Sequence, residues 1–270
     1  MKSYATPSDR LPKIHLYGDP SAKTLDLRRI TSYFESMFGK ISVDIRPPLL
    51  VRTAGVEHIA RDLASTKVRD LLRADFETDT LPGEIDFERR LISNPALRIL
   101  GVVYDGYKLQ AVLRKLLPEE ELDAGHVHIV FTNRLFVTWD ESDGRHHARV
   151  SVYGFPSIIS TTGIVEAPAR PKEYYMLKQG YAALGATVPA AELAKFRARF
   201  IDYDDARLTE VMKGYAAQAL FYHIFGEPFC EDKKCRLFNS HWQEEVLESQ
   251  LGKQEFCARH AKMLGELKHP

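Results

Sequence analysis

The three cysteines of the chain all lie in one C-terminal stretch. Cys230 and Cys235 belong to "EPFCEDKKCRLF" (227–238), and Cys257 belongs to "EFCARHAKML" (255–264), which also contains His260. The spacing is therefore Cys230-x4-Cys235, a gap of about 20 residues, and Cys257-x2-His260. Two pairs of soft or borderline ligands at this spacing are typical of a tetrahedral structural zinc site.

The local sequence around the cysteines favours zinc over a core position. Free cysteines often behave as small buried hydrophobic side chains, which is the alternative interpretation. The flanking segment "EDKKCR" is too polar for a core, whereas a short "CARH" turn can direct both of its side chains at one ion. We predict one structural Zn²⁺ held by Cys230, Cys235, Cys257 and His260, which would organise a segment with little core of its own.

The composition indicates a globular protein with no global charge. Lys plus Arg and Asp plus Glu number 37 each in 270 residues, so no overall field would attract nucleic acid or a membrane. The N-terminal "MKSYATPSDRLPKIHLYG" has no apolar signal-peptide core, and no stretch approaches the length of a membrane span. The odd cysteine count argues against a disulfide framework, and we expect a cytoplasmic protein.

The first 45 residues predict an α/β arrangement. "KIHLYG" (13–18) alternates like a strand, "TLDLRRITSYFESMFG" (24–39) carries a helical apolar stripe, and "ISVDI" (41–45) returns as a strand. This order predicts a right-handed parallel crossover. Helical segments are expected from about 56 to 72 and near 87–92.

The middle of the chain is expected to be strand-rich. "HVHIVFTNRLFVTW" (126–139) and "HARVSVYGFPSII" (147–159) are separated by the polar turn segment "DESDGRHH". In the second strand, Val150 and Val152 are expected on the same face. "TTGIVEAPARPKEYY" (161–175) is rich in proline and is predicted to be a long ordered loop.

A long helix is predicted just before the cysteines. It starts at "DYDDARL", where Asp204 or Asp205 can cap it, and it ends at Gly226. We predict a single domain over 1–270 with a zinc-knuckle subregion at 227–265. A domain boundary near "APARP" is the alternative.

The region around this helix resembles the archaemetzincins, which are metzincin-type zinc proteases. Their motif H-E-x-x-H-x-x-G-x-x-H-C continues with a second cysteine after four residues, a methionine, and F-C-x-x-C near the C-terminus. This chain reads "ALFYHIFGEPFCEDKKCRLF" and later "EFCARH", so it matches at His223, Gly226 and the three cysteines, and His260 takes the place of the fourth structural cysteine. "GFPSIISTTGIVEAPARP" is similar to a signature of a group of metallopeptidases related to this family.

The resemblance implies a zincin-like mixed α/β sheet with helices and a C-terminal structural zinc, but it fails at the catalytic positions. The first histidine, the glutamate and the third histidine of the motif fall on Ala219, Leu220 and Phe229, and the methionine falls on Leu237. Alanine and leucine offer zinc no lone pair, and a catalytic zinc usually takes three protein ligands plus water. His223 is therefore a vestigial motif position, and no catalytic residue is predicted.

The resulting functional prediction is a pseudo-peptidase with a retained cleft. An extended peptide or protein segment is the expected partner, bound along the edge strand "HARVSVYGF" by β-augmentation. Whether the protein forms oligomers is left open by the sequence.

Two other functions remain open from the residues. One is an active metallohydrolase with a relocated metal site that combines His223 with some of His126, His128, His146 and His147. The other is a zinc-knuckle module that binds nucleic acid through Lys233, Lys234 and Arg236, although the neutral chain and the acidic run "EEVLE" weigh against it. Neither nucleic acid nor a membrane is an expected partner.

Overall fold

A five-stranded mixed sheet forms the centre of the protein. The computed structural model describes residues 11–52, 55–74 and 79–268. Four of the strands are parallel and the fifth, β7, is an antiparallel edge strand. In spatial order they are β2 (Val43–Arg46), β1 (Lys13–Tyr17), β4 (His126–Thr132), β8 (Ser157–Ser160) and β7 (Ser151–Val152).

The predicted strand–helix–strand order with parallel strands is confirmed at the start of the chain. The helix α1 (Leu27–Phe38) connects β1 to the parallel strand β2. The Asp26 side chain caps the helix by accepting from the backbone N–H groups of Arg28 and Arg29, and Gly39 ends it with φ +70°.

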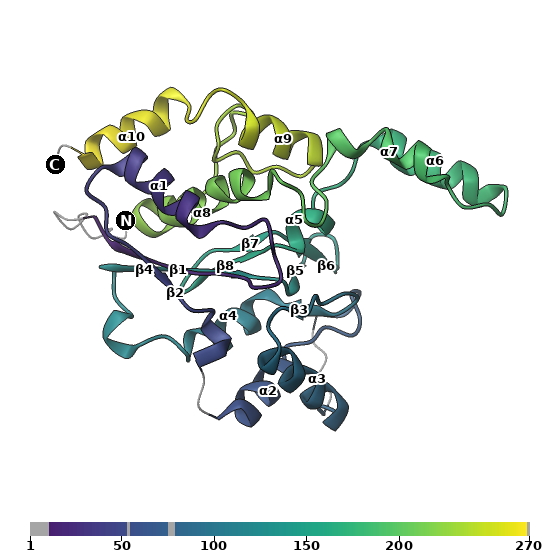
Figure 1. Ribbon diagram of the computed structural model, residues 1–270, viewed down its shortest axis with the longest axis horizontal. Coiled ribbons are helices and arrows are strands. Elements are labelled where there is room, and N and C mark those ends of the chain that lie inside the picture. Colours follow the sequence, from purple (N-terminus) through teal and green to yellow (C-terminus); the bar gives the residue numbers. More distant parts are fainter. Residues whose placement is uncertain (1–10, 53–54, 75–78, 269–270) are drawn as a thin grey trace.

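Helices cover one face of this sheet and build the larger core. They are α1, α8 (Leu208–Phe225), α9 (Gln243–Leu251) and α10 (Ala258–Lys268), all above the sheet in Figure 1. Alternate strand residues such as Ile14 and Leu16 point toward them, and Met212 and Leu220 pack from α8. Every second residue of the strands and the apolar stripe of each helix face one another, and together they form the buried interior of this layer.

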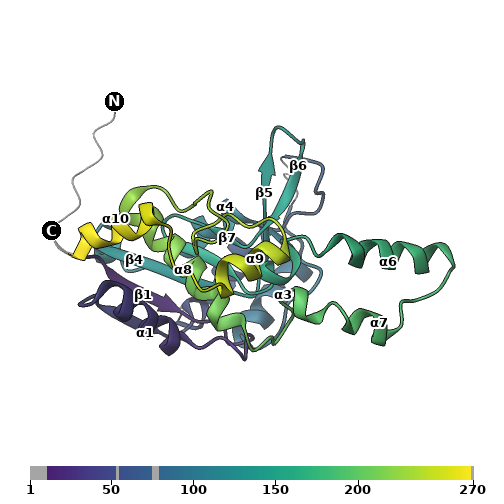
Figure 2. The same cartoon turned by 90° about the horizontal axis from the view of Figure 1, so that it is seen from above.

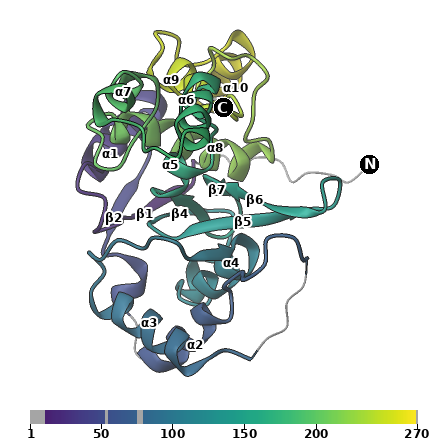
Figure 3. The same cartoon turned by 90° about the vertical axis from the view of Figure 1, so that its right-hand side faces the viewer.

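A second layer lies on the opposite face. It contains α2 (Val56–Ala64), α3 (Pro82–Ser93), α4 (Gly106–Arg114) and a small sheet of order β3-β5-β6, as seen in Figures 1 and 3. The strands of this sheet are β3 (Val103–Asp105), β5 (Leu135–Asp140) and β6 (Arg145–Arg149). Tyr17, Val130 and Ile158 of the large sheet pack into this core. The predicted mixed α/β class is thus confirmed.

Both long strands predicted in the middle of the chain are wrong in extent. Residues 126–139 form two strands, β4 in the large sheet and β5 in the small one, because the chain turns at Asn133. Residues 147–159 contribute to β6, β7 and β8. Val150 packs into the upper core and Val152 into the lower one, so the two valines do not share a face.

Three other boundaries differ from the prediction. The expected loop at 161–175 contains α5 (Gly163–Glu166) and the start of α6 (Lys172–Ala183), because a proline is tolerated immediately before the first turn of a helix. The helix predicted to run to about 72 ends at Ala64. The helix α8 begins at Leu208, and Asp205 instead accepts from the backbone N–H of Arg207 in a turn before it.

An arm projects from the body between α5 and α8. It consists of α6 and α7 (Ala190–Ala194), which extend away from both layers in Figures 1 and 2. On either side of the arm, Ile159 of β8 and Ala216 of α8 belong to the same core, so the chain before and after "APARP" packs together. The single domain over 1–270 stays a prediction.

No helix in the described part of the chain combines the length and the apolar composition that crossing a membrane would need.

Candidate metal centres and groove

The four predicted zinc ligands meet at the C-terminal end of the structure. Cys230 and Cys235 lie in the loop after α8, whereas Cys257 and His260 lie at the start of α10. Their ligand atoms, three sulfurs and one imidazole nitrogen, all fall within 4.8 Å of one another. The tertiary structure therefore brings together the two halves of the spacing pattern.

Two of the three distances between ligand atoms match the edges of a zinc tetrahedron, and the third is shorter. With Zn–S near 2.3 Å and Zn–N near 2.0 Å, the ligand–ligand edges should measure about 3.5–3.8 Å. The Sγ atoms of Cys230 and Cys257 are 3.8 Å apart, and His260 Nδ1 lies 3.6 Å from Cys235 Sγ and 3.2 Å from Cys257 Sγ. Three thiols and an imidazole in this arrangement could hold a metal ion in a closed site.

Local backbone hydrogen bonds shape the first half of this cluster. The N–H of Asp232 donates to the Sγ of Cys230 at 3.3 Å, as expected for a metal-binding knuckle. The Cys230 N–H donates to the Leu237 carbonyl, and the Cys235 N–H donates to the Asp232 carbonyl. These bonds turn the Cys-x4-Cys segment back on itself, so both thiols point the same way.

The electrostatics of the thiols favour a cation. Burial raises the pKa of the Cys235 thiol to about 12, and burial also raises the pKa of Cys230. Burial acts in the same sense on Cys257, but the backbone N–H of His260 and the neighbouring thiols hold the pKa of Cys257 below its ordinary value. Buried thiolates need a bound cation to offset their desolvation, and Zn²⁺ fits this donor set.

Three positions of the predicted vestigial motif, Ala219, Leu220 and His223, lie on α8, and within the described residues none of them belongs to a group of metal-ligating side chains. Ala219 and Leu220 are completely buried in the upper core. His223 Nε2 is 2.9 Å from the carbonyl oxygen of Ala124, and its ring lies against Phe155 with centroids 5.6 Å apart. Burial lowers the pKa of His223, so its neutral form is favoured.

A groove of about 520 Å³ runs between the edge strand β7 and α8, within the usual range of ligand pockets. From α8 it is lined by Tyr215, Gln218 and Tyr222, which share one helical face. Ala219 and His223 lie one position further along, so neither lines the groove. The i, i+4 pair that faces the groove is therefore Gln218 and Tyr222.

Several aromatic side chains that line this groove contact one another. The Tyr153 ring lies 6.0 Å from Tyr222 and 5.8 Å from Phe229, and its hydroxyl donates to Gln218 Oε1 at 2.5 Å. Among the described residues, the lining includes one histidine, His241, and no cysteine, aspartate or glutamate. The groove is thus lined by a mixture of aromatic and polar side chains, and its described lining offers no cluster of metal ligands.

The strand histidines form a different group from the predicted one. His126 and His128 share a face of β4, as expected, but their neighbours are His15 of β1 and Glu121. His146 and His147 lie on β6 in the other sheet, against Trp139 and Asp143 respectively. Within the described residues, His223 joins no group of three metal-ligating side chains. The predicted set for a relocated site is therefore wrong in its membership.

His15 and Glu121 were missed by the sequence reasoning. The signal was present, because polar residues alternate with apolar ones in "KIHLY", "VDIR" and "HVHIV", three segments that are otherwise typical of buried strands. Parallel pairing aligns His15 with Asp44 on one side and with His128 on the other. Only the register shows that these alternating polar positions meet.

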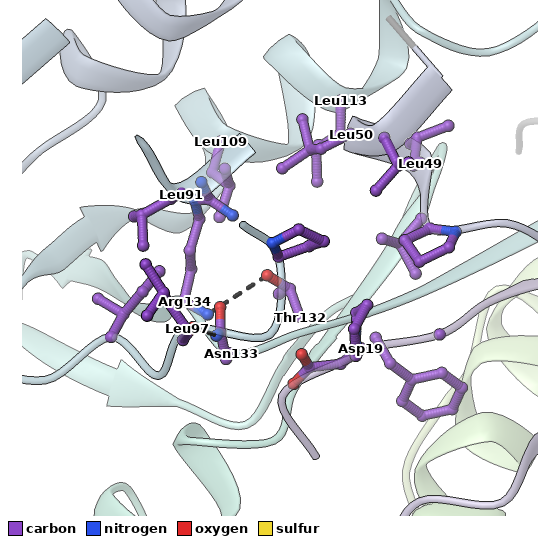
Figure 4. A pocket seen from close by; sticks show the side chains of 18 residues that line it. Asp19, Leu49, Leu50, Leu91, Leu97, Leu109, Leu113, Thr132, Asn133 and Arg134 are labelled. Atoms are coloured by element: carbon purple, nitrogen blue, oxygen red, sulfur yellow. Dashed lines mark hydrogen bonds between the residues drawn. The ribbon is translucent and has the colours of Figure 1, made fainter. Parts of the chain in front are cut away.

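A smaller hollow lies at the carboxyl ends of β1 and β4 (Figure 4). Asp19, Thr132 and Asn133 line one side of it, and Leu49 and Leu113 stand opposite. Its volume of about 50 Å³ accommodates a few water molecules, whereas a substrate-sized ligand needs roughly 300 Å³ or more. Asp19 is also committed to Ser21 and Thr161.

Two of the three basic residues near the cysteines form ion pairs within the protein. Arg236 is buried and forms ion pairs with Glu210 and Glu255, and Lys233 lies 3.2 Å from Glu245. Of the three cations that suggested nucleic-acid binding, Arg236 thus serves the packing of the C-terminal segment.

A mixed sheet, a long helix beside its edge strand and a Cys₃His group together define an α/β protein that could hold a metal ion. The chain belongs to the Probable metallopeptidase family (DUF6775), whose model matches residues 10–267. Membership of this family confirms the resemblance to metallopeptidase relatives that the sequence predicted.

Among solved structures, the chain is similar to the crystal structure of an archaemetzincin from Methanopyrus kandleri. The two share 14% identity, 98% of each chain is covered, and the TM-score is 0.48. No curated protein matches the chain.

Proposed function

We propose that this protein is a pseudo-peptidase that keeps one structural zinc in its Cys₃His cluster and binds extended peptide in the groove beside β7. The observation that carries the proposal is the composition of the groove. Its described lining has a single histidine and no carboxylate, so it offers neither the three ligands nor the general base that a zinc peptidase requires.

The geometry of α8 supports the loss of catalysis. A motif histidine and glutamate at positions 219 and 220 would lie in the core, where alanine and leucine are now fully buried. The remaining histidine, His223, uses Nε2 on a backbone carbonyl. Removing a general base alone typically costs ~10²–10⁴ in rate, and removing the ligands removes the reaction centre.

The edge strand and the aromatic residues support peptide binding. Among the described residues, β7 pairs with β8 alone, so its outer edge can receive an extended segment. Tyr222 and Phe229 are 37% and 42% exposed in the groove, where they can contact apolar side chains of such a segment. The groove would thus select an extended peptide with an aromatic or large aliphatic residue.

A peptide-library experiment tests both parts of the proposal. The zinc-loaded protein should retain peptides rich in aromatic residues and should leave them uncleaved in mass spectra. Phe229→Ala should weaken the retention at least ~tenfold, as expected for loss of an aromatic anchor. Tyr175→Ala is a matched control, since Tyr175 is an equally exposed aromatic residue on α6, outside the groove (43%).

Two results would contradict the proposal. Cleavage that a chelator abolishes would show an active peptidase. Equal peptide retention by Phe229→Ala, Tyr175→Ala and the unmodified protein would show that the groove is not the binding site.

A further inference from the structure

A second group of metal-ligating side chains lies on the lower face of the large sheet. His15 comes from β1, His126 from the first position of β4, and Glu121 from the short turn before β4. One ligand atom from each falls within 4.8 Å of the other two. His15 Nε2 is 2.9 Å from His126 Nδ1 and 3.8 Å from Glu121 Oε2.

We propose that His15, His126 and Glu121 bind a divalent first-row transition-metal ion, with Zn²⁺ as the best fit. Two imidazole nitrogens and a carboxylate oxygen are donors that this class of ion accepts. Zn–N and Zn–O bonds near 2.0 Å give ligand–ligand edges of about 3.3 Å. This value lies midway between the His15–His126 distance of 2.9 Å and the His15–Glu121 distance of 3.8 Å. Three protein ligands leave one tetrahedral position for water or another small ligand.

The surroundings of His15 resemble the support that metal-binding histidines usually have. Its Nδ1 is buried, makes no hydrogen bond with any described residue, and lies 3.4 Å from Asp44 Oδ2. Asp44 is held in turn by Arg46 Nε at 2.8 Å. A carboxylate beside the second ring nitrogen orients the imidazole and keeps the other nitrogen free for the ion. A small movement of Asp44 would complete this hydrogen bond.

The third histidine of this face is excluded as a ligand because both of its nitrogens are engaged. His128 Nδ1 lies 3.1 Å from the Tyr17 hydroxyl, and His128 Nε2 lies 3.2 Å from the carbonyl oxygen of Glu121. Its ring stacks on His15 at 4.7 Å. His128 thus positions His15 and the backbone of Glu121.

The nearby charges set the strength of the site. Arg46 donates to both carboxylate oxygens of Glu121 at 2.6 Å, which reduces the attraction for a cation. A carboxylate has about four lone-pair positions, so it can accept from Arg46 and still bind an ion. With Asp44 included, the three charged groups sum to −1. This balance predicts weaker binding than in the Cys₃His cluster.

The site is accessible and separate from the groove. The Glu121 side chain is 16% exposed and that of Asp44 is 40% exposed, so an ion can exchange with solvent. None of the three ligands lines the groove beside β7. The inference therefore does not depend on the proposed peptide binding, and either can fail alone.

The competing interpretation is a network of neutral histidines without an ion. A proton shared between His15 Nε2 and His126 Nδ1 at 2.9 Å would satisfy one nitrogen of each ring. That network predicts no metal uptake, whereas the proposed site must release this proton when it binds a metal, so its affinity rises with pH.

Cobalt titration of the full chain separates the two interpretations. A mild chelator removes exchangeable ions while the C-terminal zinc is retained, and Co²⁺ is then added. We expect one equivalent to bind with visible d–d bands and without a sulfur-to-cobalt charge-transfer band. His126→Ala should weaken this binding by more than ~100-fold, since direct ligands matter more than outer-shell partners. His58→Ala is the control, because His58 is 78% exposed on α2.

A second variant keeps the test decisive if His126→Ala folds poorly. Asp44→Asn leaves all three ligands in place and should weaken Co²⁺ binding by ~10–100-fold through loss of the outer-shell carboxylate. Failure of the unmodified protein to bind this one equivalent of Co²⁺ would overturn the proposal. Equal Co²⁺ affinity in the unmodified protein, Asp44→Asn and His58→Ala would overturn it too.

Discussion

The protein gathers metal-ligating side chains in two places by different routes. In the C-terminal cluster, the four ligands come from residues 230–260, a single stretch of chain. On the sheet, His15 and His126 are 111 positions apart and meet because β1 and β4 are parallel neighbours. The first cluster joins two short segments about 20 residues apart, each shaped by a local turn, whereas the second depends on the register of the sheet.

The two groups of ligands also differ in their donor atoms. Three sulfurs and a nitrogen fill a zinc tetrahedron and leave no position for water, which suits a structural role. Two nitrogens and one oxygen, with Arg46 paired to the oxygen-donating Glu121, leave one position open and bind less tightly. We infer that the first site maintains the fold, whereas the second exchanges its ion with the surroundings.

The largest effect is expected from Cys257→Ser. This change removes one thiolate from the C-terminal cluster, so the zinc should be lost and the segment from 230 to 260 should loosen, with a loss of several kcal/mol. Zinc content and hydrogen exchange measure the outcome. His260→Cys should keep the ion, because zinc accepts four cysteines. Unchanged zinc content and melting temperature in Cys257→Ser would refute the assignment.

A glutamate at position 220, where the resemblance aligns the motif glutamate, should destabilise the fold. Leu220→Glu places a carboxylate in a fully buried position without a partner, at a cost of roughly 3–5 kcal/mol in the free energy of unfolding. Tyr222→Glu, two positions along the same helix and 37% exposed, should cost less than ~1 kcal/mol. Urea unfolding of both variants gives the difference, and equal stabilities would mean that position 220 is not in the core.

A mild chelator should distinguish the two proposed metal sites, because only the Cys₃His cluster should keep its ion. After dialysis against a mild chelator, we expect about one zinc per chain, held by the closed thiolate site. Adding Zn²⁺ back should restore a second, weaker equivalent at His15, His126 and Glu121. Elemental analysis before and after re-addition makes the comparison. Two ions that both survive the chelator would show that the sites do not differ as proposed.

The smallest effect concerns His223 and pH. Burial lowers the pKa of His223 in the folded protein, so below pH ~6.5 the unfolded chain binds more protons there and stability falls. The loss of stability continues until the pH drops below the pKa of His223 in the folded protein. His223→Gln should therefore flatten the fall of unfolding free energy below pH ~6.5, whereas the exposed control His58→Gln should not. A steeper fall in His223→Gln would contradict a buried neutral histidine.

The sequence alone was enough to predict the C-terminal cluster and the first crossover. Cys230, Cys235, Cys257 and His260 are specified by ligand type and by short spacings that local turns can close. The strand–helix–strand start is specified by apolar periodicity and by Gly39 at the end of α1. Each ligand pair and each element of the crossover depends on residues close along the chain, which a sequence pattern records directly, whereas the contact between the two ligand pairs also needs the packing of the C-terminal segment.

Only the tertiary structure decided which face of α8 meets the groove and which histidines meet on the sheet. A shift of one position, about 100° around a helix, separates Gln218 and Tyr222 in the groove from Ala219 and His223 outside it. The neighbours of β4, and hence the contact of His126 with His15 and Glu121, follow from strand order. Helix packing and strand register determine these contacts between distant residues, and no local sequence pattern predicts either of them.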